Sequence, residues 1–73
     1  MSKEFLIHTQ PDCAYCTAAK RMLENKGISY QETNERSDVW PTWPAIYVKE
    51  GEKDRLVGGY RHLCDYLIHS GIL

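Results

Sequence analysis

The chain has 73 residues, a formal net charge of −1 at neutral pH, and 42% hydrophobic residues. A chain this short is expected to form one domain, residues 1–73, and to bury only about 60% of its unfolded surface. The charge balance argues against nucleic acid as a partner, and no apolar run approaches the ~18 residues of a membrane span. Met1-Ser2-Lys3-Glu4 does not resemble a secretory signal, so a cytoplasmic protein is expected.

The first half of the chain predicts a strand, a helix and a second strand. Residues 4–9 are typical of a buried strand, and Asp12 is a suitable N-cap for the helix that follows. From residue 14 to residue 26 apolar side chains recur at helical spacing, and Gly27 is placed to end the helix. Residues 28–33 alternate like a strand. A strand, helix and strand in succession predict that the two strands are parallel.

The second half predicts a polar crossover, two strands and a final helix. The crossover is irregular over residues 34–41, with one helical turn at most. The other expected elements are a strand over 45–48 opened by Pro44, a charged turn over 49–55, a short strand at 56–57, and a helix over 60–69. Leu63 and Leu67 lie on one stripe of that helix, which predicts its buried face.

Cysteines carry the strongest chemical signal in the sequence. There are three, and an odd number in a chain without a secretory signal argues against a framework of structural disulfides. Two of them form the motif Cys13-Ala14-Tyr15-Cys16 at the expected start of the first helix, where unpaired backbone N–H groups favour a thiolate. A thiolate beside a second thiol can exchange a disulfide with another molecule. A zinc site completed by Cys64 and His69 is the alternative for the same motif.

Four features in this order resemble the glutaredoxin family. The cysteine motif is similar to the family's Cys-Pro-Tyr-Cys, and Thr42-Trp43-Pro44 is similar to its Thr-Val-Pro, in which the proline follows a cis peptide bond. Val57-Gly58-Gly59-Tyr60 is similar to its Gly-Gly turn, and residues 63–67 match its last helix. The resemblance implies a minimal thioredoxin-like α/β fold with a four-stranded mixed sheet, two main helices, and a middle helix that is reduced or absent.

The resemblance also implies roles for individual residues. Cys13 would be the nucleophile and Cys16 the resolving thiol of a dithiol oxidoreductase that uses glutathione as co-substrate and holds no tightly bound cofactor. The glycine pair would approach the γ-glutamyl carboxylate of glutathione, and the backbone of Trp43 would pair with the substrate. The expected binding residues are Gln10, Tyr15, Thr42, Trp43, Pro44, Gly58, Gly59, Tyr60 and Arg61.

Departures from the family pattern leave other functions open. Gln10 stands where the family often has lysine, and Asp12 adds a negative charge beside Cys13, so the pKa of Cys13 is expected to be lowered less than in lysine-bearing relatives. Arg61-His62 replaces a serine or aspartate pair. It is closer to redoxins that take electrons from thioredoxin reductase and supply ribonucleotide reductase. Ala14 replaces a proline that is thought to hinder the binding of an iron–sulfur cluster between two subunits. A cluster- or metal-binding adaptor is therefore the third candidate function.

Several further side chains are interpreted structurally. Cys64 is expected to be a small buried side chain, and the charges of residues 49–55 are expected to lie in a solvated turn. Trp43 is expected beside the site, whereas Trp40 either joins it or only covers the shortened crossover. The protein is expected to act as a monomer on disulfide-containing proteins, with ribonucleotide reductase as one client suggested by the family.

Overall fold

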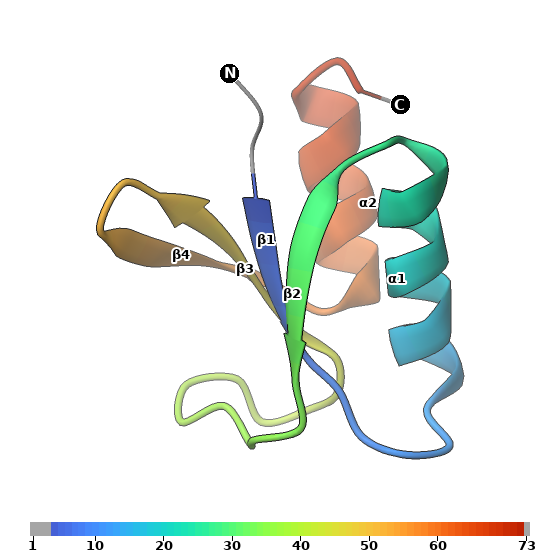
Figure 1. The fold of residues 1–73 in the computed structure, drawn as a ribbon, viewed down its shortest axis with the longest axis vertical. Helices are drawn as coiled ribbons and strands as arrows, with labels where there is room; N and C mark the ends of the chain where they lie inside the picture. Colours follow the sequence, from blue (N-terminus) through green and yellow to red (C-terminus); the bar gives the residue numbers. More distant parts are fainter. Residues whose placement is uncertain (1–3, 73) are drawn as a thin grey trace.

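The structure is a computed structural model that describes residues 4–72, in which four strands form a mixed sheet and two helices pack against one of its faces (Figure 1). The expectation about Met1-Ser2-Lys3 lies outside these residues. Within them, neither helix is long and apolar enough to cross a membrane. The elements in chain order are β1 (Glu4–His8), α1 (Ala14–Asn25), β2 (Ser29–Thr33), β3 (Ala45–Glu50), β4 (Lys53–Gly58) and α2 (Tyr60–His69).

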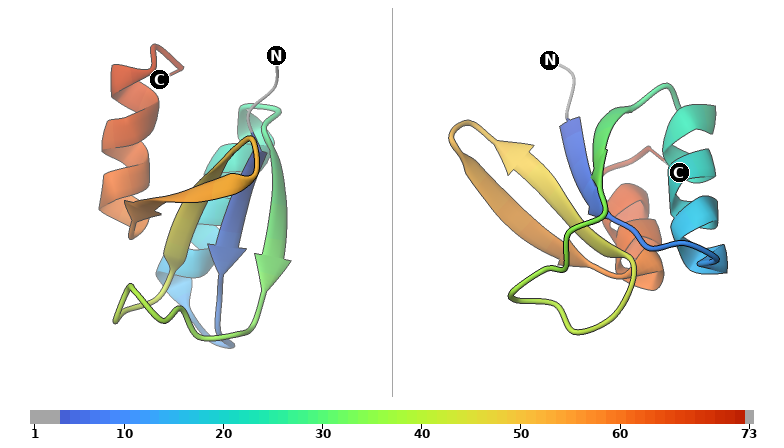
Figure 2. Two further views of the ribbon diagram at one scale, coloured as in Figure 1. Left: turned by 90° about the vertical axis from the view of Figure 1, so that its left-hand side faces the viewer. Right: turned by 60° about the horizontal axis from the view of Figure 1, so that its bottom comes forward.

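The sheet order is β2-β1-β3-β4. β1 pairs with β2 in parallel, as predicted, and β3 is antiparallel to both β1 and β4. α1 makes the crossover between the two parallel strands, and α2 lies beside it (Figure 2). The predicted fold class, a four-stranded mixed sheet with two main helices, is therefore confirmed.

The core lies between the sheet and the two helices. β1 contributes Phe5 and Ile7, which are fully buried, while the residues that alternate with them along the strand are only partly buried. This alternation places every second side chain of β1 under the helices. Leu23 of α1 and the predicted pair Leu63 and Leu67 of α2 complete the same cluster. Each such side chain stabilises the fold by roughly 1.5–3 kcal/mol on burial.

The residues that cap α1 set where the helix begins and ends, and its N-terminal end carries the cysteine pair. Its N-cap is Cys13, so the predicted Asp12 cap is wrong. Asp12 instead adopts a left-handed backbone (φ 58°), which turns the chain before the helix and leaves the cap to the next residue. At the other end Gly27, also left-handed with φ 68°, follows the C-cap residue Lys26, as the sequence predicted.

No helix forms between β2 and β3; residues 34–44 cross the end of the sheet as an irregular loop, seen at the bottom of the molecule in Figure 2. The hydroxyl of Ser37 accepts the backbone N–H groups of Val39 (3.2 Å) and Trp40 (3.1 Å) and bonds the hydroxyl of Tyr47 on β3. His8 Nδ1 donates to the carbonyl of Glu35 at 2.8 Å. These bonds hold the loop against the strand ends, where a helix was expected to be reduced or lost.

The hairpin differs from the prediction of a long charged turn. β3 continues to Glu50 and β4 starts at Lys53, so only Gly51 and Glu52 form the turn. The register places Glu50 opposite Lys53 and Lys49 opposite Asp54. Opposite charges that face each other across two strands favour pairing. The charged residues are exposed, as expected, except for Lys49, which is partly buried, and all but Glu52 belong to strands.

Candidate active site

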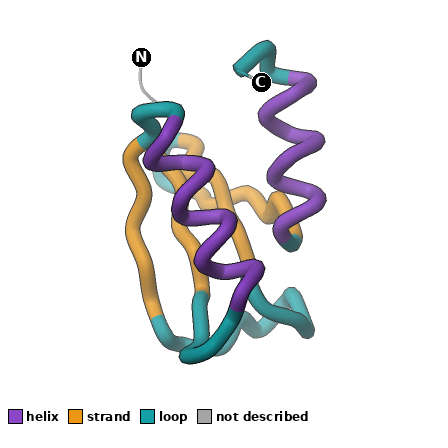
Figure 3. Tube along the Cα trace, turned by 90° about the vertical axis from the view of Figure 1, so that its right-hand side faces the viewer, coloured by secondary structure: helices purple, strands orange, loops and turns teal. Residues whose placement is uncertain are grey.

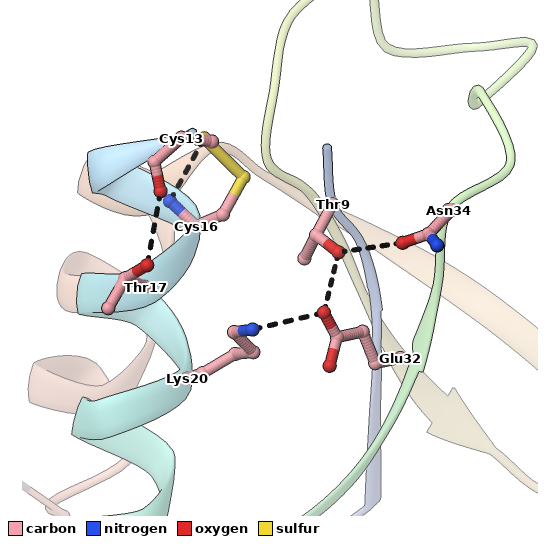
Figure 4. The surroundings of a disulfide bond; sticks show 7 residues. All are labelled: Thr9, Cys13, Cys16, Thr17, Lys20, Glu32 and Asn34. Atoms are coloured by element: carbon pink, nitrogen blue, oxygen red, sulfur yellow. Dashed lines mark hydrogen bonds and ion pairs between the residues drawn. A yellow bond between two sulfur atoms is a disulfide. The ribbon is translucent and has the colours of Figure 1, made fainter. Parts of the chain in front are cut away.

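The Cys13–Cys16 pair forms a disulfide at the N-terminus of α1 (Figure 4). The two Cα atoms are 5.2 Å apart, and Cys13 Sγ accepts the backbone N–H of Cys16 at 3.1 Å. The sulfur of Cys13 therefore caps the helix and meets an N–H group that would stabilise a thiolate. Cys13 is partly exposed, whereas Cys16 is only 2% exposed. The geometry leaves Cys13 as the sulfur that a second molecule can reach.

Both cysteines open onto a hollow of about 640 Å³, the polar cavity. Its walls come from the chain before α1, the first turns of α1, and the end of β2. The lining residues are Thr9, Gln10, Pro11, Asp12, Cys13, Ala14, Cys16, Thr17, Lys20, Glu32 and Asn34. Of the predicted binding residues, Gln10 alone lies here with the cysteines.

A hydrogen-bonded network forms the inner wall of the polar cavity (Figure 4). Glu32 Oε2 accepts the Thr9 hydroxyl at 2.7 Å and forms an ion pair with Lys20 Nζ at 3.0 Å. Thr9 is buried, and its bond, followed by that of Lys20, lowers the pKa of Glu32. The sequence interpretation missed this network because its members come from β1, α1 and β2. The one available signal was the spacing of Cys16 and Lys20, four residues apart on the same helix face.

A second hollow of about 300 Å³, the aromatic groove, lies on another side of α1. Tyr15 points 100° around the helix from Cys16, so it reaches this groove rather than the polar cavity. The lining residues are Tyr15, Trp40, Thr42, Trp43, Pro44, Gly59, Tyr60, Arg61 and His62. The rings of Tyr15 and Tyr60 lie 5.8 Å apart and join the two helices across one wall. The lining includes a cationic arginine and no acidic side chain.

The crossover loop supplies the aromatic groove with both tryptophans. The Trp43–Pro44 bond is cis, as predicted, and Pro44 is buried while Trp43 stays partly exposed. Trp40 does more than cover the crossover, because its indole packs over Gly59 and meets the His62 ring edge-on at 5.2 Å. Among the described residues, its Nε1 is the buried side-chain donor left without a hydrogen-bond partner.

The glycine pair sets the end of the groove at the start of α2. Gly58 has φ 121°, and a Cβ there would lie 2.7 Å from the His62 ring, so both conformation and space require glycine. Gly58 lies beneath the groove rather than in its lining. Gly59 is the N-cap of α2, and its N–H donates to His62 Nδ1 at 3.4 Å. One of the backbone donors expected to face a ligand is thus already occupied.

Cys64 is partly exposed, which corrects the expectation of a buried side chain. It lies one turn after Tyr60 on α2. The charge that Cys64 can carry raises the pKa of the Tyr60 phenol most, and a hydrogen bond between the two side chains raises it further. The position outside the core follows from the helix phase, because Leu63 and Leu67 take the buried stripe. Among residues 4–72, no three His, Cys, Asp or Glu side chains gather as a metal site.

Comparisons with known proteins match the first half of the chain by sequence and most of the chain by structure. The sequence model of the glutaredoxin family matches residues 5–38, which include both cysteines of the pair. The crystal structure of glutaredoxin 1 from Francisella tularensis complexed with cacodylate has a TM-score of 0.71 and 22% identity, over 93% of this chain and 99% of that one. A search of curated proteins finds no match. The family model matches fewer than half of the residues, so the two findings show that the chain shares the glutaredoxin fold and resembles that family in sequence around the cysteine pair.

Proposed function

We propose that the protein reduces protein disulfides and glutathione mixed disulfides by a dithiol mechanism, with glutathione as the electron donor. The observation that carries the proposal is the position of Cys13. It caps α1 through its own sulfur, 3.1 Å from a backbone donor, with Cys16 within bonding reach behind it. This is the arrangement that a nucleophilic thiolate and a resolving thiol require.

The reaction proceeds in two exchanges. The Cys13 thiolate attacks one sulfur of the client disulfide, a mixed disulfide forms, and the other client sulfur leaves as a thiolate that takes a proton from water. Cys16 then loses its proton and attacks Cys13, which forms the internal disulfide and releases the second client sulfur. Two glutathione molecules reduce that disulfide and leave as glutathione disulfide. With a glutathionylated client, Cys13 attacks the glutathione sulfur and the client thiolate leaves; a glutathione thiolate then attacks that same sulfur, leaves with it as glutathione disulfide, and restores the Cys13 thiolate without Cys16.

The aromatic groove is the proposed binding site of glutathione. Its ligand carries carboxylates, and the groove offers Arg61 and the N-terminus of α2 with no acidic side chain in its lining. Tyr15 and Trp43 supply apolar walls, and the backbone of Trp43, before the cis proline, could pair with the tripeptide. Thr42, Gly59 and Tyr60 complete this proposed surface.

A paired assay tests the electron donor. Reduction of a disulfide is followed by NADPH consumption, first with glutathione and glutathione reductase, then with thioredoxin reductase. Turnover in the first mixture is expected. Turnover only with thioredoxin reductase would reject glutathione as the donor and retain the oxidoreductase.

The thioredoxin-reductase pathway is the second candidate because of one contact. His62 already accepts the Gly59 N–H, so the start of α2 offers a ligand one donor fewer than an uncapped glycine turn. Arg61 could then face an acidic partner protein instead of the tripeptide. In this case the protein would supply electrons to ribonucleotide reductase. Either role suits a monomer in a reducing compartment such as the cytoplasm.

A further inference from the structure

We infer that Lys20 is a positioning residue for the resolving cysteine: its ammonium group, held in the polar cavity by Glu32, stabilises the thiolate of Cys16 when the mixed disulfide is resolved. The inference rests on the proposed role of Cys16 and deepens it. The sequence interpretation assigned no function to Lys20 or Glu32.

The placement of Lys20 is the first observation. It follows Cys16 by four residues on α1, and side chains at this spacing lie one turn apart on the same helix face, about 5–6 Å between their Cβ atoms. Both residues line the polar cavity. Figure 3 shows α1 running alongside the strands with its first turn at the end where the loops gather, and Figure 4 shows the lysine extending from α1 toward β2 below the disulfide.

The burial of Cys16 supplies the need. Its side chain is 2% exposed, and removal from water disfavours a thiolate. The helix N-terminus favours Cys13 first, because the sulfur of Cys13 is the one that accepts the backbone N–H. A cation in the same cavity is therefore the remaining group that can offset the cost of ionising Cys16. Lys20 is the cationic side chain in the lining of the cavity.

The anionic side chains that line the cavity are Glu32 on β2 and Asp12 before α1. Glu32 is a poor proton acceptor, because the bonds from Thr9 and Lys20 lower its pKa. Its role is to hold Lys20 at 3.0 Å while the disulfide is closed. The Thr9 hydroxyl, 2.7 Å away, keeps Glu32 in place when the ammonium group turns to the sulfur. Asp12 opposes the lysine by adding negative charge at the rim.

In the step itself the Cys16 thiol releases its proton to water in the cavity, and its thiolate is stabilised by Lys20. The Cys16 sulfur attacks Cys13, the new bond closes the internal disulfide, and the bond from Cys13 to the client breaks. The client sulfur leaves with the electron pair and is protonated by water. Lys20 then returns to Glu32. No oxidant or reductant beyond the client is required.

The direct test measures the pH midpoint of Cys16 thiolate formation. Alkylation of Cys16 by iodoacetamide is followed by mass spectrometry across pH, in a Cys13→Ser, Cys64→Ser chain. Lys20→Met is expected to raise the midpoint by about one pH unit, and Lys20→Arg is expected to restore it. Glu32→Gln is expected to lower it, because the lysine is then no longer neutralised. Lys49→Met is the matched control, since that lysine bonds Gln31 at 3.0 Å on the sheet.

The kinetic test uses the intact pair. Lys20→Met is expected to slow dithiol reduction of a protein disulfide about tenfold at pH 7, as one unit of pKa implies. In a Cys16→Ser chain, Lys20→Met is expected to leave the rate of reduction of a glutathionylated peptide unchanged. Shifts of equal sign for Lys20→Met and Glu32→Gln, or equal loss in both backgrounds, would overturn the inference in favour of a purely structural role. The midpoint is measured without any electron donor, so it stands even if glutathione dependence fails.

Discussion

The polar cavity and the aromatic groove both adjoin the start of α1, yet they differ in how their charges are arranged. In the polar cavity two of the three charged side chains form an ion pair, Lys20 with Glu32, and Glu32 also accepts a hydrogen bond from a buried threonine. In the aromatic groove Arg61 is exposed among rings and a helix N-terminus. Paired charges keep a fixed electrostatic environment for the thiols, whereas an open cation and apolar walls suit a ligand that arrives from solution. This contrast supports the proposal that the polar cavity serves the sulfur chemistry and the aromatic groove serves binding.

The largest expected effect separates the two cysteines. Cys13→Ser is expected to abolish turnover with every disulfide, because the attacking sulfur is lost. Cys16→Ser is expected to keep reduction of a glutathionylated peptide and to lose reduction of a protein disulfide, since the second exchange needs the resolving thiol. Both rates are measured by coupled NADPH consumption. Equal loss from the two variants would contradict the assigned roles.

A smaller effect is expected where the groove depends on a glycine. Gly58→Ala places a Cβ in a left-handed conformation 2.7 Å from the His62 ring, which is expected to cost about 2–4 kcal/mol of unfolding free energy. Displacement of His62 is expected to raise KM for glutathione substrates as well. The matched control is Gly51→Ala, where φ is 63° but nothing lies within 4 Å of the new Cβ.

Urea denaturation measures the first effect and steady-state kinetics the second. The control is expected to cost about 1 kcal/mol, from backbone strain alone, and to leave KM unchanged. If both variants behaved alike, the contact between Gly58 and His62 would have no importance for the groove.

The charge in the aromatic groove is expected to affect binding more than chemistry. Arg61→Glu is expected to raise KM for a glutathionylated peptide roughly tenfold, with little change in kcat, and the difference is expected to shrink in high salt. Arg55→Glu is the control, because that exposed arginine lies on β4 outside the groove. A kcat that falls while KM stays constant would move Arg61 from binding to the chemical steps.

The smallest effect probes the polar cavity. Thr9→Val removes the hydrogen bond that first lowers the pKa of Glu32, and is expected to cost about 1 kcal/mol near neutral pH. Because the native pKa of Glu32 lies below its ordinary value of 4.5, this stabilisation is present above pH 4.5 and is lost as pH falls through the lowered native value. The two stability curves should therefore converge in acid. Parallel stability curves across pH would show that Thr9 does not lower the pKa of Glu32.

Local patterns in the sequence predicted much of the architecture. The bounds of α2, the end of α1 at Gly27, and the parallel pairing of β1 with β2 follow from side-chain period, glycine conformation and connection length. These properties depend on residues close together in the chain, so one sequence is sufficient. The resemblance of motifs added the cis bond at Pro44 and the missing middle helix. The same local reasoning gave too long a turn before β4, because strand pairing of charges depends on the partner strand.

What the tertiary structure alone decided are contacts between distant segments. Thr9 reaches Glu32 across 23 positions, and Trp40 comes to rest over Gly59 only because the shortened crossover folds back along the strand ends. The identity of the α1 cap and the exposure of Cys64 depend on one residue's backbone angle and on helix phase, which composition does not specify. The sequence by itself predicted the pair of sulfurs that we propose to react and the helix on which they lie. Packing decided which charged side chains lie near the buried sulfur of Cys16, because the electrostatic environment of a side chain is set by its neighbours in space.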